Sequence, residues 1–190
     1  MPLLARGAMV FALVGIGVVL GWQLTVVFGG NRDDDAVANI EGHGGHVRRW
    51  SRPTVISLWD SDRMGDVQFV GFRNHAITDD DLDDIVSLRR CIAVGFVECT
   101  FDDRKRLVRL KGMPALDTLV LTDCGLSEND MAFLFSLERL RYLYLDGNPI
   151  TDDVIPMLMK VPSLKAVSVS RTSLTAAGVE KLKARFEVVP

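Results

Sequence analysis

An apolar pattern that recurs about every 24 residues constrains the fold of this chain more than any other feature. Each copy reads apolar-x-x-apolar-x-apolar-x-x-(His, Cys, Asn or Thr)-x-apolar, and the second copy is one residue longer than the others. The five copies begin at Val67, Cys91, Leu116, Leu140 and Leu164. A single unit of this kind cannot bury its apolar face alone, so the repetition predicts a stacked solenoid.

Within each copy, two apolar residues spaced by two, such as Leu143 and Leu145, predict a short strand with one buried face. The apolar residues that follow are spaced by three to five, which predicts a helix or helical turn returning on the opposite face. N-cap residues are expected at Thr78, Ser127, Thr151 and Thr175. Neighbouring strands would stack in parallel about 4.8 Å apart. We therefore expect a right-handed α/β solenoid with about five parallel strands.

The sequence resembles the leucine-rich-repeat family, in particular short bacterial repeats whose second half reads ITDxxLxxLxxL. The resemblance rests on residues 77–79 and 150–152, both Ile-Thr-Asp, each followed by apolar residues at steps of three. It covers residues 67–190. The resemblance implies parallel strands on a concave face, helical turns on a convex face, and protein ligands bound on the concave face.

A column of small or polar residues follows the predicted strands, where the turning chain leaves backbone groups that need partners. The resemblance implies that this column is a structural ladder, with side chains bonded to neighbouring backbone. Its members are Cys99, Cys124, Asn148 and Thr172, while His75 departs from the pattern in the first copy. With Cys91, the chain has three cysteines, and this odd number excludes a full disulfide framework. A Cys99–Cys124 disulfide stays open as an alternative, but we expect three buried free thiols.

The two ends of the stack need caps. The apolar segment 54–59, TVISLW, predicts a strand that covers the first edge of the sheet. Val188, one further step of 24 beyond Leu164, predicts a truncated sixth strand that closes the other edge.

Residues 7–28 contain no charged side chain and are long enough to cross a bilayer as a helix. A cleaved signal peptide is the alternative, but the stretch is long and no A-x-A-like site follows it. We therefore expect an uncleaved single-pass anchor within residues 1–30, with the repeat domain exported to the periplasmic or extracellular side. Gly17 and Gly21 form a G-x-x-x-G pair, which predicts weak self-association.

Residues 31–52 are glycine-rich, charged and without periodicity, and predict a flexible tether to a repeat domain at 53–190. Glu41, His43 and His46 suggest an alternative function, an exported metal- or ligand-binding protein that uses this tether. The two histidines lack a third well-placed ligand and supporting contacts, so we expect no metal site. The five aspartates between Asp79 and Asp84 suit a helix N-terminus better than a calcium loop.

The sequence contains no motif of a serine hydrolase, P-loop enzyme or zinc protease, so we expect no enzyme activity and no cofactor. A net charge of −3 without a basic, aromatic-rich patch argues against nucleic acid. Function should therefore lie at the outward strand positions. We expect partner contacts from Phe69, Arg73, Tyr142, Tyr144 and Asp146.

Both tyrosines of the chain fall on this predicted concave face, and tyrosine is enriched in binding hot spots. The alternative is that the two rings merely shield the sheet. The sequence thus predicts a non-catalytic, membrane-anchored module that binds a protein or peptide on the concave face of its repeats.

Overall fold

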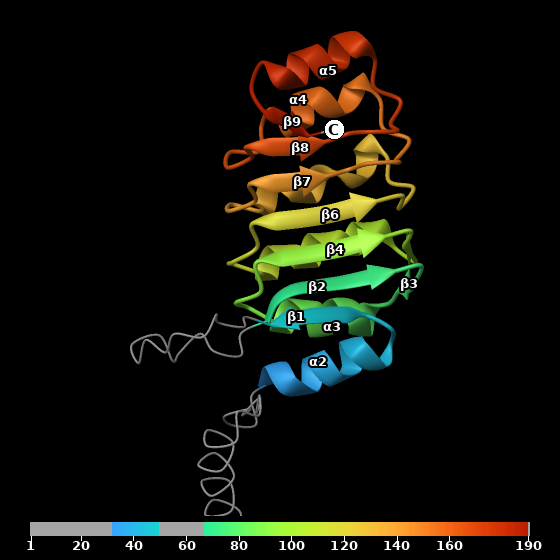
Figure 1. Ribbon diagram of the computed structural model, residues 1–190, viewed down its shortest axis with the longest axis vertical. Coiled ribbons are helices and arrows are strands. Elements are labelled where there is room, and N and C mark those ends of the chain that lie inside the picture. The colour runs from blue at the N-terminus through green and yellow to red at the C-terminus, as the bar shows by residue number, and fades with distance from the viewer. Residues whose placement is uncertain (1–31, 50–66, 190) are drawn as a thin grey trace, which may run out of the picture. The chain divides into compact units, whose positions relative to one another are not determined.

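In this computed structural model, the described residues are 32–49 and 67–189. The predicted anchor at 7–28 and the predicted capping strand at 54–59 lie outside them. A seven-stranded sheet with the order β1-β2-β4-β6-β7-β8-β9 organises the described chain (Figure 1). Its strands are β1 (His46–Arg49), β2 (Val67–Arg73), β4 (Ala93–Val97), β6 (Thr118–Thr122), β7 (Tyr142–Tyr144), β8 (Ala166–Ser168) and β9 (Glu187–Val189).

Helical segments return the chain between successive parallel strands and lie together behind the sheet (Figure 1). They are α3 (Asp79–Ser87), α4 (Ile155–Leu158), α5 (Ala176–Lys183) and the 3-10 helices η2 (Arg104–Gly112), η3 (Glu128–Asp130), η4 (Ala132–Ser136) and η5 (Asp152–Val154). A small parallel pair, β3 (Ala76–Ile77) and β5 (Thr100–Phe101), flanks the first returns. Thr78, Thr151 and Thr175 each accept a backbone N–H as N-caps, as predicted.

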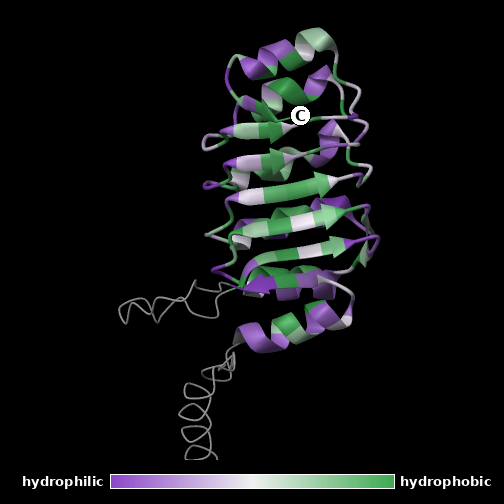
Figure 2. Cartoon of the chain, in the orientation of Figure 1, coloured by the Kyte–Doolittle hydropathy of each residue, from purple (hydrophilic) through white to green (hydrophobic). Residues whose placement is uncertain are grey.

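The predicted stacking of the copies is confirmed by the strand register. The inward residues Leu119, Leu143 and Val167 pair in neighbouring parallel strands and are fully buried. Together with the equivalent residues of β2 and β4 they form the core between the sheet and the helices. In Figure 2, hydrophobic colour accordingly runs through β2, β4 and β6.

The last strand differs from the prediction in register. Strand β9 exists and pairs parallel to β8, but Val188 lies opposite Val167. The sequence pattern had placed Val188 in the column of Leu164, three residues earlier. The final return, which contains α5, is three residues shorter than those of the 24-residue copies, so the strand begins earlier in the period. The buried Phe186 leads the chain into this strand.

A column of left-handed backbone conformations turns the chain out of successive strands. The φ angles are 49° at Asn74, 55° at Glu98, 52° at Asp123, 69° at Gly147 and 56° at Arg171. Each residue comes directly before a position of the ladder column, which His75 occupies in the first copy. In the first four copies its amide donates to a carbonyl of the next copy, as the amide of Glu98 does to the Thr122 carbonyl at 2.9 Å. Four of the five positions are not glycine. They adopt the left-handed conformation although it is unfavourable for L side chains.

The first edge of the sheet is covered by a segment that the sequence analysis had assigned to the tether. Helix α2 (Arg32–Gly42) buries Ala36, Val37 and Ile40 and packs against α3, and strand β1 pairs antiparallel with β2. The prediction of a flexible segment across 31–52 is therefore wrong for residues 32–49. The glycines that suggested flexibility form the tight turn from α2 into β1. A Cβ at Gly45 would lie 2.6 Å from the side chain of Ile40.

Candidate interaction surface

The face of the sheet that no helix covers is called the open face here, and it corresponds to the concave face of the sequence prediction (Figure 1). Two rows of outward side chains cross it in register from β2 to β8. The first row contains Phe69, Ala93, Thr118, Tyr142 and Ala166, and the second contains Gly71, Gly95, Val120, Tyr144 and Ser168. Phe69, Tyr142 and Tyr144 are the largest side chains of these rows, whereas Ala166 and Ser168 on β8 are buried.

The Phe69 ring reaches over the sheet because the second row begins with two glycines. A Cβ added at Gly71 would lie 2.6 Å from the Phe69 ring, and one at Gly95 would lie 3.2 Å from it. Beside the ring is a hollow of about 290 Å³, to which Val97 and Val120 also contribute. The two glycines thus permit an aromatic ring and an apolar hollow at the same place on the open face.

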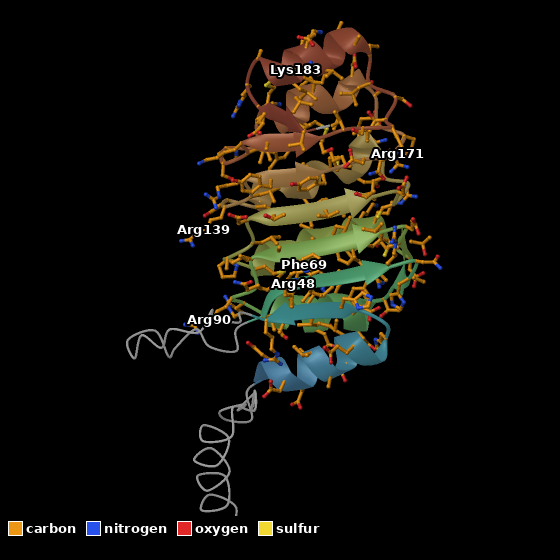
Figure 3. All side chains as sticks on the ribbon, viewed as in Figure 1. Arg48, Phe69, Arg90, Arg139, Arg171 and Lys183 are labelled. Carbon is orange, nitrogen blue, oxygen red and sulfur yellow. The ribbon has the colours of Figure 1, made fainter. Side chains whose placement is uncertain are left out.

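Strand β1 adds two cationic or titratable side chains that the sequence analysis had assigned to the tether. In the antiparallel pair, His46 lies opposite Gly71 and Arg48 lies opposite Phe69. Directly opposed residues share a face, so both side chains project on the open face. Figure 3 shows Arg48 and Phe69 as neighbours on β1 and β2. The alternation His-Val-Arg, with Val47 packed against the core, is the strand signal that could have revealed them.

Tyr142 and Tyr144 are both half-buried on β7, with a leucine between them that points into the core. The Arg141 guanidinium lies 5.5 Å from the centre of the Tyr142 ring, within the range of a cation–π contact. Arg141 is in turn held by Asp117, whose carboxylate accepts from its Nε at 2.7 Å. The Arg141–Asp117 pair therefore contacts the Tyr142 ring from one side.

The two predicted polar contacts have partners of their own within the described chain. The Asp146 carboxylate accepts hydrogen bonds from the Ser168 hydroxyl at 2.6 Å and the Ser170 amide at 2.7 Å. It thereby ties the end of β7 to the end of β8. Arg73 is exposed and lies 3.4 Å from Glu98, a surface pair that contributes little to stability. Arg73 is thus the more available of the two for a partner.

Asn148 connects two copies through buried hydrogen bonds. Its Oδ1 accepts from the amides of Cys124 and Leu126 at 3.1 and 3.0 Å. Its Nδ2 donates to the carbonyls of Leu121 and Leu145 at 2.5 and 2.8 Å. The side chain is 1% exposed, so it cannot be reached by a partner.

The other members of the ladder column make fewer bonds. The Thr172 hydroxyl donates to the Val169 carbonyl at 2.7 Å. The Cys99 thiol lies 3.4 Å from the Phe72 carbonyl, and the Cys124 thiol 3.4 Å from the Phe96 carbonyl, each reaching the preceding copy. Such thiol contacts are weak compared with those of an amide.

The three cysteines are buried free thiols. Burial raises the pKa of Cys91 to about 11 and that of Cys124 to about 12. Burial also raises the pKa of Cys99. A thiol in this state is not a nucleophile at neutral pH. The cysteines therefore serve as small packing groups within the stack.

His43 and His46, with Glu41 the basis of the alternative metal hypothesis, do not come together. The His43 Nδ1 lies 2.7 Å from the buried carboxylate of Asp81, whereas His46 lines the hollow on the open face. Among residues 32–49 and 67–189, no group of three His, Cys, Asp or Glu side chains is placed to hold a metal. The alternative function thus has no assembled site in this part of the chain.

Asp81 instead joins the N-terminal cap, which is formed by α2 and β1, to the first repeat. Its Oδ2 accepts from the Thr78 amide at 2.9 Å and the Thr78 hydroxyl at 2.7 Å, and the same oxygen lies 3.2 Å from the His75 Nε2. Burial alone would raise the pKa of Asp81, but the hydrogen bonds from Thr78, His43 and His75 outweigh it and lower the pKa to about 2. The carboxylate is therefore a structural anion between α3, the end of β2 and the cap.

Three solved structures align with this chain at low sequence identity. The leucine-rich-repeat ectodomain of the receptor kinase SOBIR1 from Arabidopsis thaliana aligns at 18% identity with a TM-score of 0.47, over 83% of this chain and 91% of that one. An internalin C2 from Listeria monocytogenes aligns at 19% identity with a TM-score of 0.44, over 83% and 73% of the two chains. An internalin of the same organism, inlF, aligns at 16% identity with a TM-score of 0.40, over 60% and 38%.

No protein-family model matches the sequence, and no curated protein is similar to it. At the identities and scores above, the structural neighbours carry no conclusion about function. The repeat architecture rests on the chain's own strand register. None of the helices in the described part of the chain is long and apolar enough to span a membrane.

Proposed function

We propose that this protein is a non-catalytic, membrane-anchored interaction module that binds a protein or peptide on the open face of its repeats. The observation that carries the proposal is the set of half-buried aromatic rings, Phe69, Tyr142 and Tyr144, on strands of one rigid sheet that no helix covers. Aromatic side chains held on a rigid scaffold supply large contact area at low entropic cost.

The buried groups of the repeats support a structural rather than a catalytic role for the remaining polar residues. Backbone groups satisfy the hydrogen bonds of Asn148, and Thr78 and two histidines satisfy those of Asp81. Burial raises the pKa of the thiols, as at Cys124. No buried side-chain nitrogen or oxygen in the described part of the chain lacks a hydrogen-bond partner. The polar interior is thus committed to the stack, which leaves the open face for recognition.

The membrane anchor at residues 7–28 is part of the proposal and rests on the sequence alone. An uncleaved span would hold the repeats close to the bilayer, on the periplasmic or extracellular side. Weak self-association through Gly17 and Gly21 would be confined to that span. Recovery of a mature chain that begins after residue 28 would show instead a cleaved signal peptide and a released repeat domain.

The proposal is tested by comparing two aromatic surfaces. Full-length protein is crosslinked in its native membranes and purified, and the captured proteins are quantified for wild type, for Tyr142→Ala with Tyr144→Ala, and for Phe135→Ala. Phe135 is the matched control, because it is 42% exposed but lies on η4 in the helical layer. We expect the double variant to lose the specific partner, since truncating a hot-spot tyrosine costs about 2 kcal/mol or more. Loss with Phe135→Ala alone would contradict the proposal.

A further inference from the structure

The hollow beside Phe69 combines an apolar floor with a basic rim. Its floor is formed by Phe69, Val97 and Val120, and two glycines keep the backbone of the sheet close to the surface. The hollow of about 290 Å³ is large enough to take an aliphatic side chain of a partner. Burial of such a side chain would remove apolar area from water on both sides.

Basic side chains from two strands lie around the hollow. His46 of β1 and Arg73 at the end of β2 line it, and Arg48 of β1 lies opposite Phe69 in the strand pair. Arg48 is exposed and forms no ion pair with any residue of 32–49 or 67–189. No acidic side chain lines the hollow, and the nearby Glu98 is engaged by Arg73 at 3.4 Å. An arginine beside an apolar surface binds a carboxylate more strongly than one surrounded by water.

The opposite end of the open face carries charges of both signs. Asp146 and Glu187 lie at the strands β7 to β9, while Arg141 contacts the Tyr142 ring and Arg171 interacts with Asp146. A long polyanion such as a nucleic acid would find no continuous positive surface along the stack. A short ligand with one local negative charge needs only the basic side chains near Phe69. The charge distribution therefore favours a peptide segment over a nucleic acid.

From these features we infer that the hollow binds a segment of a partner protein that presents a carboxylate directly beside an aliphatic side chain. The aliphatic group occupies the space between Phe69, Val97 and Val120, and the carboxylate pairs with Arg48 on β1. The inference rests on the proposed function, because it names the partner chemistry at one part of the same face. It assigns Arg48 and Phe69 as residues that determine specificity, separately from the two tyrosines.

The test uses the full-length protein, purified in detergent, and a displayed library of random seven-residue peptides. Selection is repeated with Arg48→Glu, with Phe69→Ala and with the double tyrosine variant. We expect wild type to enrich peptides with Asp or Glu next to Leu, Ile, Val or Met. A synthetic peptide of this kind should bind Arg48→Glu and Phe69→Ala at least about tenfold more weakly, as expected for the loss of a charged hydrogen bond or an apolar anchor.

Arg48→Glu is the more informative of the two variants, because it tests binding without altering stability. Arg48 is exposed on an edge strand, so its reversal should leave thermal unfolding unchanged even if Phe69→Ala lowers it. The reversed charge should also shift the enriched peptides towards Lys and Arg. Peptides without a carboxylate, no enrichment at all, or binding unaffected by Arg48→Glu would overturn the inference. If binding instead depends only on Tyr142 and Tyr144, the proposed function stands and this assignment fails.

Discussion

Replacement of Asn148 by alanine should destabilise the repeat stack strongly without touching the open face. The side chain supplies two acceptor bonds, to the amides of Cys124 and Leu126, and two donor bonds, to the carbonyls of Leu121 and Leu145. All four backbone groups would lose this partner at once. A buried polar group without a partner costs about 1–3 kcal/mol, but the turn can relax and admit water, so we expect a total loss of about 3 kcal/mol.

Thermal unfolding of the full-length protein measures this loss. For a chain of this size, about 3 kcal/mol corresponds to a fall in Tm of roughly 6–12 °C. Thr172→Ala removes a single hydroxyl bond, to the Val169 carbonyl, and should cost only about 1 kcal/mol. Asn129→Ala, at an exposed position on η3, should change stability by no more than about 0.5 kcal/mol.

The prediction is that the loss of stability is largest for Asn148→Ala, smaller for Thr172→Ala and smallest for Asn129→Ala. If Asn148→Ala unfolds within about 0.5 kcal/mol of wild type, its hydrogen bonds do not connect the copies in solution. If Thr172→Ala is the more damaging variant, stability is concentrated in the last copy rather than at the Asn148 turn. Either result would refute the role given to this column.

Three further outcomes are expected. Gly147→Ala should cost about 1–2 kcal/mol in thermal unfolding, because φ is 69° and the new Cβ would lie 1.9 Å from the Asp123 carboxylate, whereas Glu98→Gly should cost less. The pKa of Asp81 falls from 3.8 to about 2 on folding. The ionised carboxylate therefore stabilises the fold by about 2 kcal/mol above pH 4, and this contribution is lost as the pH falls towards 2. Urea titrations should show this loss in wild type but not in Asp81→Asn. A fragment of residues 53–190, without α2 and β1, should aggregate in size-exclusion chromatography, whereas residues 32–190 should elute as a folded species; equal behaviour would show that the cap is dispensable.

The repeat period was sufficient to predict the stack of strands. Because each copy is one turn of the solenoid, residues 24 apart must lie in neighbouring strands, and alternation then separates inward from outward side chains. The pairing of Leu119, Leu143 and Val167 follows from this rule. The half-buried positions of Tyr142 and Tyr144 on the open face follow from it as well.

Features outside the period were not predictable in the same way. The cap has no repeat to align with, and its apolar residues Ala36, Val37 and Ile40 form a short helical stripe among glycines and charges. The contact of His43 with Asp81 joins residues 38 positions apart and depends on how the cap packs. The assignment of residues 32–49 to a tether also concealed the contribution of Arg48 to the open face.

The repeat period alone did not predict the register of β9 correctly. The period of 24 holds only while each return has the same length, and the last return is three residues shorter. A terminal repeat is under different packing constraints from an internal one. Similarly, the left-handed conformations of Glu98 and Asp123 carry no glycine signal, and each accompanies a hydrogen bond from the residue's amide to the next copy.

The central claim, that recognition occurs on the open face, is tested most directly by site-specific photocrosslinking in living cells. A photoreactive residue replaces Thr118, which lies on β6 between Ala93 and Tyr142, or replaces Ala177, which is exposed on α5 in the helical layer. The account predicts a discrete protein adduct from position 118 and none from position 177. An adduct from position 177 alone would contradict it.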